Sequence, residues 1–489
     1  MRLVLLPWVV ALVLLSPGRP AADAATGADA LAGRLAARIA AARIPEGSLG
    51  VAVLSLGEGG AMVYGRNPTQ VLSLASVAKV LTAATALDLL GPGHAFVTRV
   101  TARGRLAAGV LEGDLVVHGS GDPHLSERAG GGTPTAVLEG LARQVAAAGV
   151  REVRGALVLD DGAFDREYLH EGWTGQDRQR AYGAPVGGLA FNDSCIEVLV
   201  GPSRRAGERG EISLPATAGP WAVENLTSTV DGRRNEAAAA WSSATRSLQV
   251  RGKVGRESGP VRVELPVPDP LAWFGGAFTR CLEASGVRVR GGMRPARDAA
   301  DRACGALLAQ HQTRLDETLR VMNRRSQNFY ASQLFKACGV AWAGRGTWEA
   351  GTEAVREMLR RRGVPLPGSA TLLDGSGLAV ENRASAGTVA LTLWKFERDL
   401  LRGPLLHDSL AAPGEEGTLD DRLVTRFTKG RLRAKTGTLG QSGVHALAGV
   451  LEAAPGRPGL AFAILVNRGT WPGNARELID DLVEILAQP

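Results

Sequence analysis

The chain has 489 residues, of which 45% are hydrophobic and 21% are charged, and this composition predicts a globular protein of two or three domains. Its four cysteines exclude a disulfide-dense scaffold and leave one or two disulfide bonds open. The formal net charge of +7 suits peripheral association with an anionic cell wall or membrane surface, although a bias towards arginine explains it equally well. No basic, aromatic-interleaved motif accompanies the charge, so we expect no nucleic-acid partner.

The first 24 residues have the pattern of a secretory signal peptide. A basic residue at position 2 precedes an almost wholly apolar run over residues 3–15, and small residues follow around Ala24. The apolar run is much shorter than the roughly 20 residues that span a bilayer, which favours cleavage after Ala24 over a membrane anchor. We therefore expect a periplasmic or otherwise exported mature protein.

The segment after the signal peptide predicts a helix, a hairpin and a second helix. Leu31, Leu35 and Ile39 recur every four residues, as in an amphipathic helix. Two short apolar runs, at residues 51–56 and 61–64, flank a glycine-rich turn and predict a β-hairpin. An alanine- and leucine-rich stretch over residues 80–90 predicts a helix, which ends at Gly91-Pro92. Ser76 therefore lies at or near the N-terminus of this second helix.

The middle of the chain differs from both ends in its pattern of apolar, polar and turn-forming residues. From residue 98 to 287 short strand-like runs alternate with glycine, proline and charged residues, which predicts an inserted, mainly β domain of one or two subdomains. Helical patterns resume at residues 315–322 and 331–337, and a strand over 460–466 precedes a C-terminal helix over 476–486. We therefore predict a catalytic domain formed by residues 25–97 and 288–489 and interrupted by the insertion.

Three short motifs occur in a fixed order: Ser76-Val77-Ala78-Lys79, Ser326-Gln327-Asn328 and Lys435-Thr436-Gly437-Thr438. A serine becomes a good nucleophile when a base removes its proton, and Lys79 lies one helical turn after Ser76. The helix N-terminus also supplies free backbone N–H groups for an oxyanion. Taken singly, each motif is more often a helix cap, a surface turn or a strand-edge loop, so it is the ordered set that predicts an acyl-transfer site.

Lys79 can act as a base only in its neutral form, which requires a lowered pKa. Burial and a nearby cation both lower the pKa of a lysine, and Lys435 is the candidate cation. No histidine lies in any of the three motifs, which fits a Ser-Lys variant of the catalytic serine constellation.

With these motifs the chain resembles the class C low-molecular-mass penicillin-binding proteins, which are the serine-type D-alanyl-D-alanine carboxypeptidases and endopeptidases of bacterial peptidoglycan. Members of that family carry a large insertion between the first two motifs, as this chain does. Gln327 departs from the aspartate that the family often has, and we expect little effect on the chemistry. Four further segments are also similar to the family: Gly119-Ser120-Gly121-Asp122-Pro123, Tyr182-Gly183-Ala184-Pro185-Val186, Asp374-Gly375-Ser376-Gly377-Leu378 with Asn382-Arg383, and Gly430-Arg431-Leu432-Arg433-Ala434.

The resemblance implies an α/β (α+β) fold, namely a penicillin-recognising serine transpeptidase/β-lactamase-like domain interrupted by the insertion. The protein would be a serine-type D-alanyl-D-alanine carboxypeptidase, with D,D-endopeptidase activity as an option, acting on peptidoglycan stem peptides. β-Lactams would acylate the same serine. His118 and His124 flank a turn without a third metal ligand, so we expect neither a metal nor a cofactor. A serine esterase or lactamase on the same scaffold and a non-catalytic wall-binding protein stay open as alternatives.

The resemblance also implies a role for each motif residue. Ser76 would attack the penultimate D-alanine while Lys79 accepts its proton. Ser326 would relay a proton to the leaving amine, and Asn328 would hold the substrate amide. The residues of the third motif would sustain a positive field and bind the terminal carboxylate: Lys435, Thr436, Gly437 and Thr438. The backbone N–H groups of the first serine and the last threonine would form the oxyanion hole.

Three residues of the insertion are weaker candidates. Asp160, Asp161 and Phe164 lie in a segment similar to one that touches the stem peptide in some relatives, although an acidic pair before a turn is more often solvated. We interpret residues 374–377, Asp-Gly-Ser-Gly, as a structural turn near the site.

Overall fold

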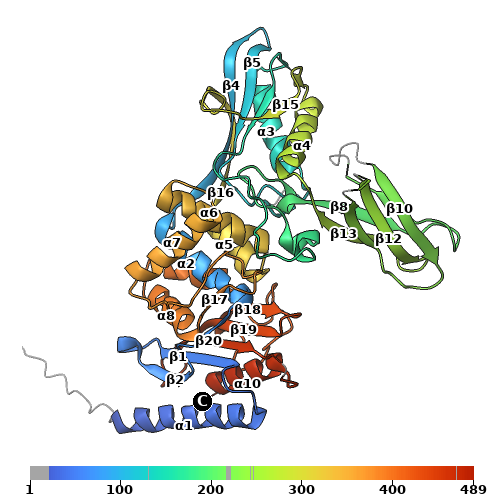
Figure 1. The fold of residues 1–489 in the computed structure, drawn as a ribbon. Helices are drawn as coiled ribbons and strands as arrows, with labels where there is room; N and C mark the ends of the chain where they lie inside the picture. Colours follow the sequence, from blue (N-terminus) through green and yellow to red (C-terminus); the bar gives the residue numbers. More distant parts are fainter. Residues whose placement is uncertain are drawn as a thin grey trace, which may run out of the picture.

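Figure 1 shows the computed structural model of the chain, which describes residues 21–129, 132–215, 222–242, 244–245, 247–469 and 471–488. The apolar run of the predicted signal peptide lies outside the described residues, and the predicted cleavage point after Ala24 falls in the first turn of helix α1 (Ala21–Ala42). In the part of the chain that is described, no helix is both long enough and apolar enough to cross a membrane.

An antiparallel five-stranded sheet joins the two ends of the chain. Its strands in spatial order are β18 (Leu432–Leu439), β19 (Val444–Leu451), β20 (Leu460–Asn467), β1 (Leu49–Ser55) and β2 (Met62–Arg66). β1 and β2 form the predicted hairpin, and β1 pairs with β20 along its whole length. β18 is the edge strand of this sheet on the side nearer the middle of the molecule (Figure 1).

Helices cover both faces of this sheet, in the lower part of Figure 1. Phe462 and Ile464 of β20 pack on α1 and α10 (Ala475–Ala487), whereas Ala463 and Leu465 face α8 (Ala386–Glu397). Because both faces are covered, β20 is a nearly continuous hydrophobic run. The amphipathic helices predicted at the two ends of the chain are confirmed.

A layer of helices lies behind α8. It is centred on α2 (Ala78–Leu89), which is buried over nearly its whole length, as is typical of a helix that is hydrophobic all round. The other helices of this part are α5 (Leu315–Arg324), α6 (Asn328–Ala343), α7 (Trp348–Arg361) and α9 (Gly403–Ser409). A small two-stranded sheet pairs β3 (Val71–Ser73) with β17 (Arg383–Ser385) next to the start of α2.

The insertion between α2 and α5 forms the upper part of Figure 1. Its main sheet contains β14 (Arg288–Val289), β6 (Glu152–Val153), β5 (Val110–His118), β4 (Ala95–Ala107) and β16 (Ala306–Arg314), with β7 (Leu157–Asp160) and β15 (Met293–Pro295) beside them. Helices α3 (Ala136–Ala147) and α4 (Pro270–Ala284) pack on this sheet around a separate hydrophobic core.

Two three-stranded sheets extend to the right of Figure 1 as an arm of the insertion. One contains β10 (Val223–Val230), β12 (Ser247–Gly255) and β11 (Ala238–Ser242), and the other contains β13 (Val261–Pro266), β8 (Cys195–Gly201) and β9 (Glu211–Ser213). The short 3₁₀ turns of the insertion are η3 (Glu127–Ala129), η4 (Asp177–Gln179), η5 (Ala181–Gly183) and η6 (Asn192–Ser194). The insertion therefore has the mainly β character that its sequence predicts.

The strand pairing differs from the predicted limits of the insertion at residues 98 and 287. β4 begins at Ala95, and β16, which ends at Arg314, pairs antiparallel with β4. A limit at residue 287 divides this sheet, because β14, β15 and β16 all follow it. Nothing in the sequence of these strands indicates which sheet they join, whereas a limit after Arg314 keeps the sheet whole.

Candidate active site

Ser76 lies in the 3₁₀ turn η2 (Ala75–Val77), directly before α2. It is partly exposed, whereas residues 72–75 and 77–87 on either side are buried. The preceding residue, Ala75, has a φ of 44°, a left-handed conformation that a residue with a Cβ keeps only when its surroundings hold it. The fold therefore presents one hydroxyl group on an otherwise buried segment.

Lys79 is fully buried, and its Nζ makes three hydrogen bonds. The nitrogen lies 2.8 Å from Oγ of Ser76, 2.6 Å from Oδ1 of Asn328 and 2.7 Å from the carbonyl oxygen of Ser376. Nδ2 of Asn328 donates to the carbonyl oxygen of Tyr182 at 3.0 Å, which turns the amide so that its oxygen faces Lys79. The first two motifs thus meet around Lys79.

Lys435 brings in the third motif. This residue is fully buried on β18, and its Nζ donates to Oγ of Ser326 at 2.8 Å and to the carbonyl oxygen of Thr436 at 2.8 Å. Ser326 lies between α5 and α6 with a φ of 57°. The two motif serines therefore each contact one buried lysine.

Strand β18 lies close against the turn that carries the first motif. A Cβ at Gly437 would lie 2.9 Å from the carbonyl oxygen of Leu74 and 3.2 Å from Cβ of Ala75, so a glycine allows this approach. Thr436 is partly exposed and Thr438 is exposed on the same strand. β18 is the last strand of its sheet, and Ala434 on its outer edge pairs with Ala411. The edge beyond Ala434 is where a ligand can bind as an added strand.

The pKa values of both lysines are lowered. Burial lowers the pKa of Lys79 to about 7, and the negative charge of Asp374 acts in the opposite direction. Burial, followed by repulsion from Lys79, lowers the pKa of Lys435 well below its usual range. Of the two causes that we expected for the shift at Lys79, burial and the charge of Lys435, burial dominates, because Lys79 has no exposed surface.

Asp374 organises the turn that contacts Lys79. Its Oδ1 accepts hydrogen bonds from the backbone N–H groups of Ser376 and Gly377. Its Oδ2 accepts from the backbone N–H of Ala379 at 2.9 Å and from Nε1 of Trp173 at 2.8 Å. The hydroxyl group of Ser376 also donates to Oδ1, so five donors hold this buried carboxylate in place near Lys79.

The same turn supports the backbone before the first motif. Gly377 has a φ of 79°, and a Cβ there would lie 1.8 Å from the carbonyl oxygen of Ala75. The sequence indicated a structural turn near the site, which agrees with the structure. The structure adds a direct contact, through the carbonyl oxygen of Ser376, with the buried lysine of the first motif.

The three weaker candidates of the insertion make other contacts. Asp160 bonds His118, Asp161 forms a bidentate pair with Arg166, and Phe164 is buried in the hydrophobic core. In the described part of the chain, no hydrogen bond or ion pair joins these three residues to the three motifs. Their contact with substrate stays a prediction.

Among the described residues, no group of three or more His, Cys, Asp or Glu side chains is arranged to hold a metal ion. His118 bonds Asp160 and His124 bonds Tyr330, so both histidines have protein partners. The cysteines carry free thiols in the structure: Cys195, Cys281, Cys304 and Cys338.

Three contacts that hold the motifs could not be predicted from the sequence. Two of them use the carbonyl oxygens of Tyr182 and Ser376. Every residue has a carbonyl oxygen, so a motif of side chains does not indicate which one makes a contact. Both residues lie in segments that are similar to the family, so the segments could be singled out but their contacts could not. The third contact joins the side chain of Gln327 to Asp193 in the insertion, far away in sequence.

Comparison with known proteins identifies the family. The D-Ala-D-Ala carboxypeptidase 3 (S13) family matches residues 31–489 of this chain. The D-alanyl-D-alanine carboxypeptidase of Actinomadura sp. (strain R39) is 34% identical, over 84% of this chain and 76% of that protein. D-alanyl-D-alanine carboxypeptidase DacB of Haemophilus influenzae is 27% identical, over 87% of this chain and 86% of that protein.

Solved structures show the same fold. Penicillin binding protein 4 (DacB) of Haemophilus influenzae superimposes with a TM-score of 0.78 at 24% identity, over 94% of this chain and 99% of that chain. Its complex with a β-lactam gives a TM-score of 0.72 at 24% identity, over 95% and 100%. A predatory peptidoglycan endopeptidase of Bdellovibrio bacteriovorus gives 0.51 at 15% identity, over 90% and 92%. The chain therefore belongs to the D-Ala-D-Ala carboxypeptidase 3 (S13) family and is a D-alanyl-D-alanine carboxypeptidase with the penicillin-recognising fold.

Proposed function

We propose that Ser76 is the nucleophile and Lys79 the general base of this carboxypeptidase. The hydrogen bonds of the buried lysine carry the proposal. Two of its neighbours, Oδ1 of Asn328 and the carbonyl oxygen of Ser376, can only accept hydrogen bonds. A neutral amine has two N–H groups for these acceptors, which leaves its lone pair for the hydroxyl group of the serine at 2.8 Å.

The reaction then proceeds through an acyl-enzyme. Oγ of Ser76 attacks the carbonyl carbon of the penultimate D-alanine while its proton passes to Lys79. The terminal D-alanine leaves after its nitrogen receives a proton through Ser326, and water hydrolyses the ester. The amide of Asn328 contacts Lys79 and Tyr182. Its role towards the substrate amide therefore falls to the second hydrogen of its NH₂ group.

The terminal carboxylate of the substrate binds beside the exposed part of β18. A hollow there is lined by Thr436, Thr438, Arg422 and Arg476. The pKa of Lys435 is lowered and Arg422 is paired with Asp480, so Arg476 supplies the initial attraction for an anion. The bound carboxylate in turn favours the charged form of Lys435. The backbone N–H groups of Ser76 and Thr438 form the oxyanion hole.

The partners that we propose are peptidoglycan stem peptides and, as covalent inhibitors, β-lactams. The β-lactam complex of the structurally similar penicillin binding protein 4 supports the second of these. An exported location, in keeping with the N-terminal sequence, gives access to the cell wall, and the basic charge favours peripheral association with it. Endopeptidase activity uses the same acyl-enzyme and differs only in the size of the leaving amine.

The proposal is tested with a synthetic peptide that ends in D-alanyl-D-alanine. Wild-type protein should release free D-alanine, and Lys79→Ala should release none above background while keeping its thermal transition. A folded Lys79→Ala protein that is acylated at the wild-type rate would refute the lysine as base. Digestion of cross-linked muropeptides then separates carboxypeptidase products from endopeptidase products.

A further inference from the structure

The second motif lies in a strained turn between two helices. α5 ends at Arg324 and α6 begins at Asn328, and Ser326 between them adopts a left-handed conformation. Such a conformation persists only where the surrounding structure holds it. Gln327 is the N-cap residue of α6, yet its side chain makes no capping hydrogen bond to the helix. This side chain is therefore used for another contact.

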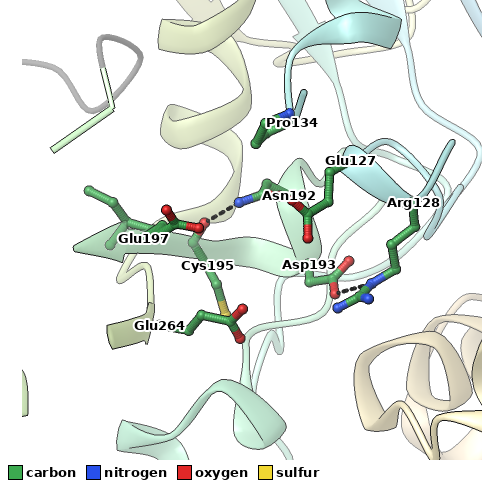
Figure 2. Close-up of a pocket in the computed structure, with 9 residues that line it drawn as sticks. Glu127, Arg128, Pro134, Asn192, Asp193, Cys195, Glu197 and Glu264 are labelled. Carbon is green, nitrogen blue, oxygen red and sulfur yellow. Dashed lines mark hydrogen bonds and ion pairs between the residues drawn. The ribbon is translucent and has the colours of Figure 1, made fainter. Parts of the chain in front are cut away.

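The side chain of Gln327 contacts the insertion. Its Nε2 donates to Oδ2 of Asp193 at 2.9 Å, and the same oxygen accepts from Nε of Arg128 at 3.1 Å. Asp193 is the middle residue of η6 (Asn192–Ser194), in which three successive residues have φ values of 51°, 54° and 53°. Figure 2 shows the carboxylate of Asp193 turned towards Arg128 at the wall of a small pocket. The strained backbone of η6 thus places the carboxylate of Asp193 beside Arg128.

The ion pair that receives Gln327 is largely shielded from solvent. The side chains of Arg128 and Asp193 are 20% and 13% exposed. Because solvent screens this pair weakly, the arginine keeps the carboxylate in place, and a hydrogen bond to a charged acceptor is stronger than one between neutral groups. The amide of Gln327 therefore has a fixed and strong acceptor.

Gln327 begins a series of polar contacts between α6 and the insertion. Three more residues, each spaced by three, continue it: Tyr330 to His124 at 3.0 Å, Gln333 to the carbonyl oxygen of Gly187 at 3.0 Å, and Lys336 to Asp165 at 2.6 Å. Residues three apart are neighbours on a helix surface, so the insertion holds α6 along one continuous row. Gln327 is the member of this row that lies inside the second motif.

We propose that Gln327 is a positioning residue, held by the Arg128–Asp193 pair of the insertion so that Ser326 and Asn328 keep their contacts with the two buried lysines. The inference rests on the proposed roles of these two motif residues. A carboxylate at position 327 would instead face that of Asp193 across the same short distance. Gln327 and Asp193 therefore form a matched pair of an amide and a carboxylate, and the insertion takes part in shaping the catalytic site.

The test exchanges the two groups while keeping their shapes. Gln327→Glu places a second carboxylate against Asp193, and adding Asp193→Asn restores an amide–carboxylate hydrogen bond in the reverse direction, beside Arg128. We expect Gln327→Glu to lower the rate constant of acylation at saturating fluorescent penicillin by about tenfold to a hundredfold, the effect of a small misplacement of catalytic groups. The double variant should recover most of this loss.

Two further readouts separate positioning from general stability. The half-saturating penicillin concentration of Gln327→Glu should stay within about threefold of wild type, because the substitution leaves Thr436 and Thr438, which bind the carboxylate on β18, unchanged. The matched control is Gln249→Glu. Nε2 of Gln249 donates to Glu224 in the arm of the insertion, so this variant creates the same repulsion away from the motifs. It should lower the thermal midpoint without lowering the acylation rate.

Wild-type acylation by folded Gln327→Glu would overturn the inference, and so would a double variant no faster than Gln327→Glu. If Gln327→Glu does not fold, Gln327→Met replaces it, since methionine keeps the length and removes the amide, and the same loss is expected. Failure of the wild-type protein to be acylated would contradict the proposed function instead, so the two failures are distinguishable.

Discussion

The carbonyl oxygen of Ser376 accepts a hydrogen bond of 2.7 Å from Nζ of Lys79, across nearly 300 residues of sequence. The turn that provides this oxygen is built on the buried carboxylate of Asp374. One segment thus gives the lysine both an acceptor for its N–H group and a nearby negative charge. The protonation state of Lys79 is set by the balance of this charge and of burial.

Replacing Asp374 with asparagine should move the acid limb of the pH–acylation profile to lower pH. The carboxylate opposes the effect of burial on Lys79, so its removal lowers the pKa of the lysine further below about 7. Neutral lysine is the active form, so a larger fraction of the variant is active below neutral pH. Acylation by fluorescent penicillin, measured from about pH 5 to about pH 9 per folded molecule, checks this. An unchanged acid limb, or one at higher pH, would be the contrary result.

Gly377→Ala should reduce acylation by at least about tenfold. A Cβ at Gly377 would meet the carbonyl oxygen of Ala75, directly before the nucleophile, and the positive φ of the glycine adds strain. The control is Gly368→Ala, because a Cβ there meets no heavy atom within 4 Å. Thermal unfolding and acylation are measured for both variants. Equal acylation by the two would show that the turn does not position Ser76.

Asp122→Asn should stabilise the protein at pH 8 and leave its stability unchanged at pH 4. Burial raises the pKa of Asp122 to about 7, so the folded protein binds a proton that the unfolded chain, with a pKa of about 3.9, has released. The wild type therefore loses stability as the pH rises from about 4 to about 7. Asparagine cannot ionise, and it can still pair with Thr313 and with the backbone N–H of His124. Urea unfolding should give a gain of up to about 4 kcal/mol at pH 8, and an equal gain at both pH values would contradict this explanation.

Arg476→Gln should weaken substrate binding without slowing the chemistry. Arg476 lines the hollow beside Thr438, is 56% exposed, and has only a loose ion pair of 3.8 Å with Asp421. We expect KM for a peptide ending in D-alanyl-D-alanine to rise a few-fold, with kcat unchanged, because a charge that attracts the carboxylate equally before and during reaction affects binding alone. The difference should shrink at high salt. Steady-state kinetics at two salt concentrations measure it, and an unchanged KM would remove Arg476 from the carboxylate site.

The sequence allowed good predictions where side-chain identity alone carries the chemistry. Ser76 and Lys79 meet because one helical turn separates them, and the ordered motifs indicated that Ser326 and Lys435 belong to the same site. Strands β1 and β20 were predicted from strong apolar runs at both ends of the chain, although their pairing was not. These features depend on local periodicity or on resemblance to a known family, both of which are visible in a single sequence.

Other features could not be predicted, for physical reasons. The hydrogen bond from Lys79 to Ser376 uses a carbonyl oxygen that every residue possesses. The dominance of burial over charge at Lys79 depends on how tightly α2 is enclosed, which only the assembled domain determines. The end of the insertion depends on the pairing of β16 with β4, and the mixed sequence of β16 does not indicate its partner strand.

The central claim is that Ser76, activated by Lys79, becomes acylated. It is tested most directly by intact-mass measurement of the purified protein after incubation with fluorescent penicillin, beside Ser76→Ala. We predict one covalent adduct per wild-type chain and none on Ser76→Ala, with both proteins showing the same thermal transition. Folded wild-type protein that stays unlabelled, or an adduct that persists on Ser76→Ala, would contradict the claim.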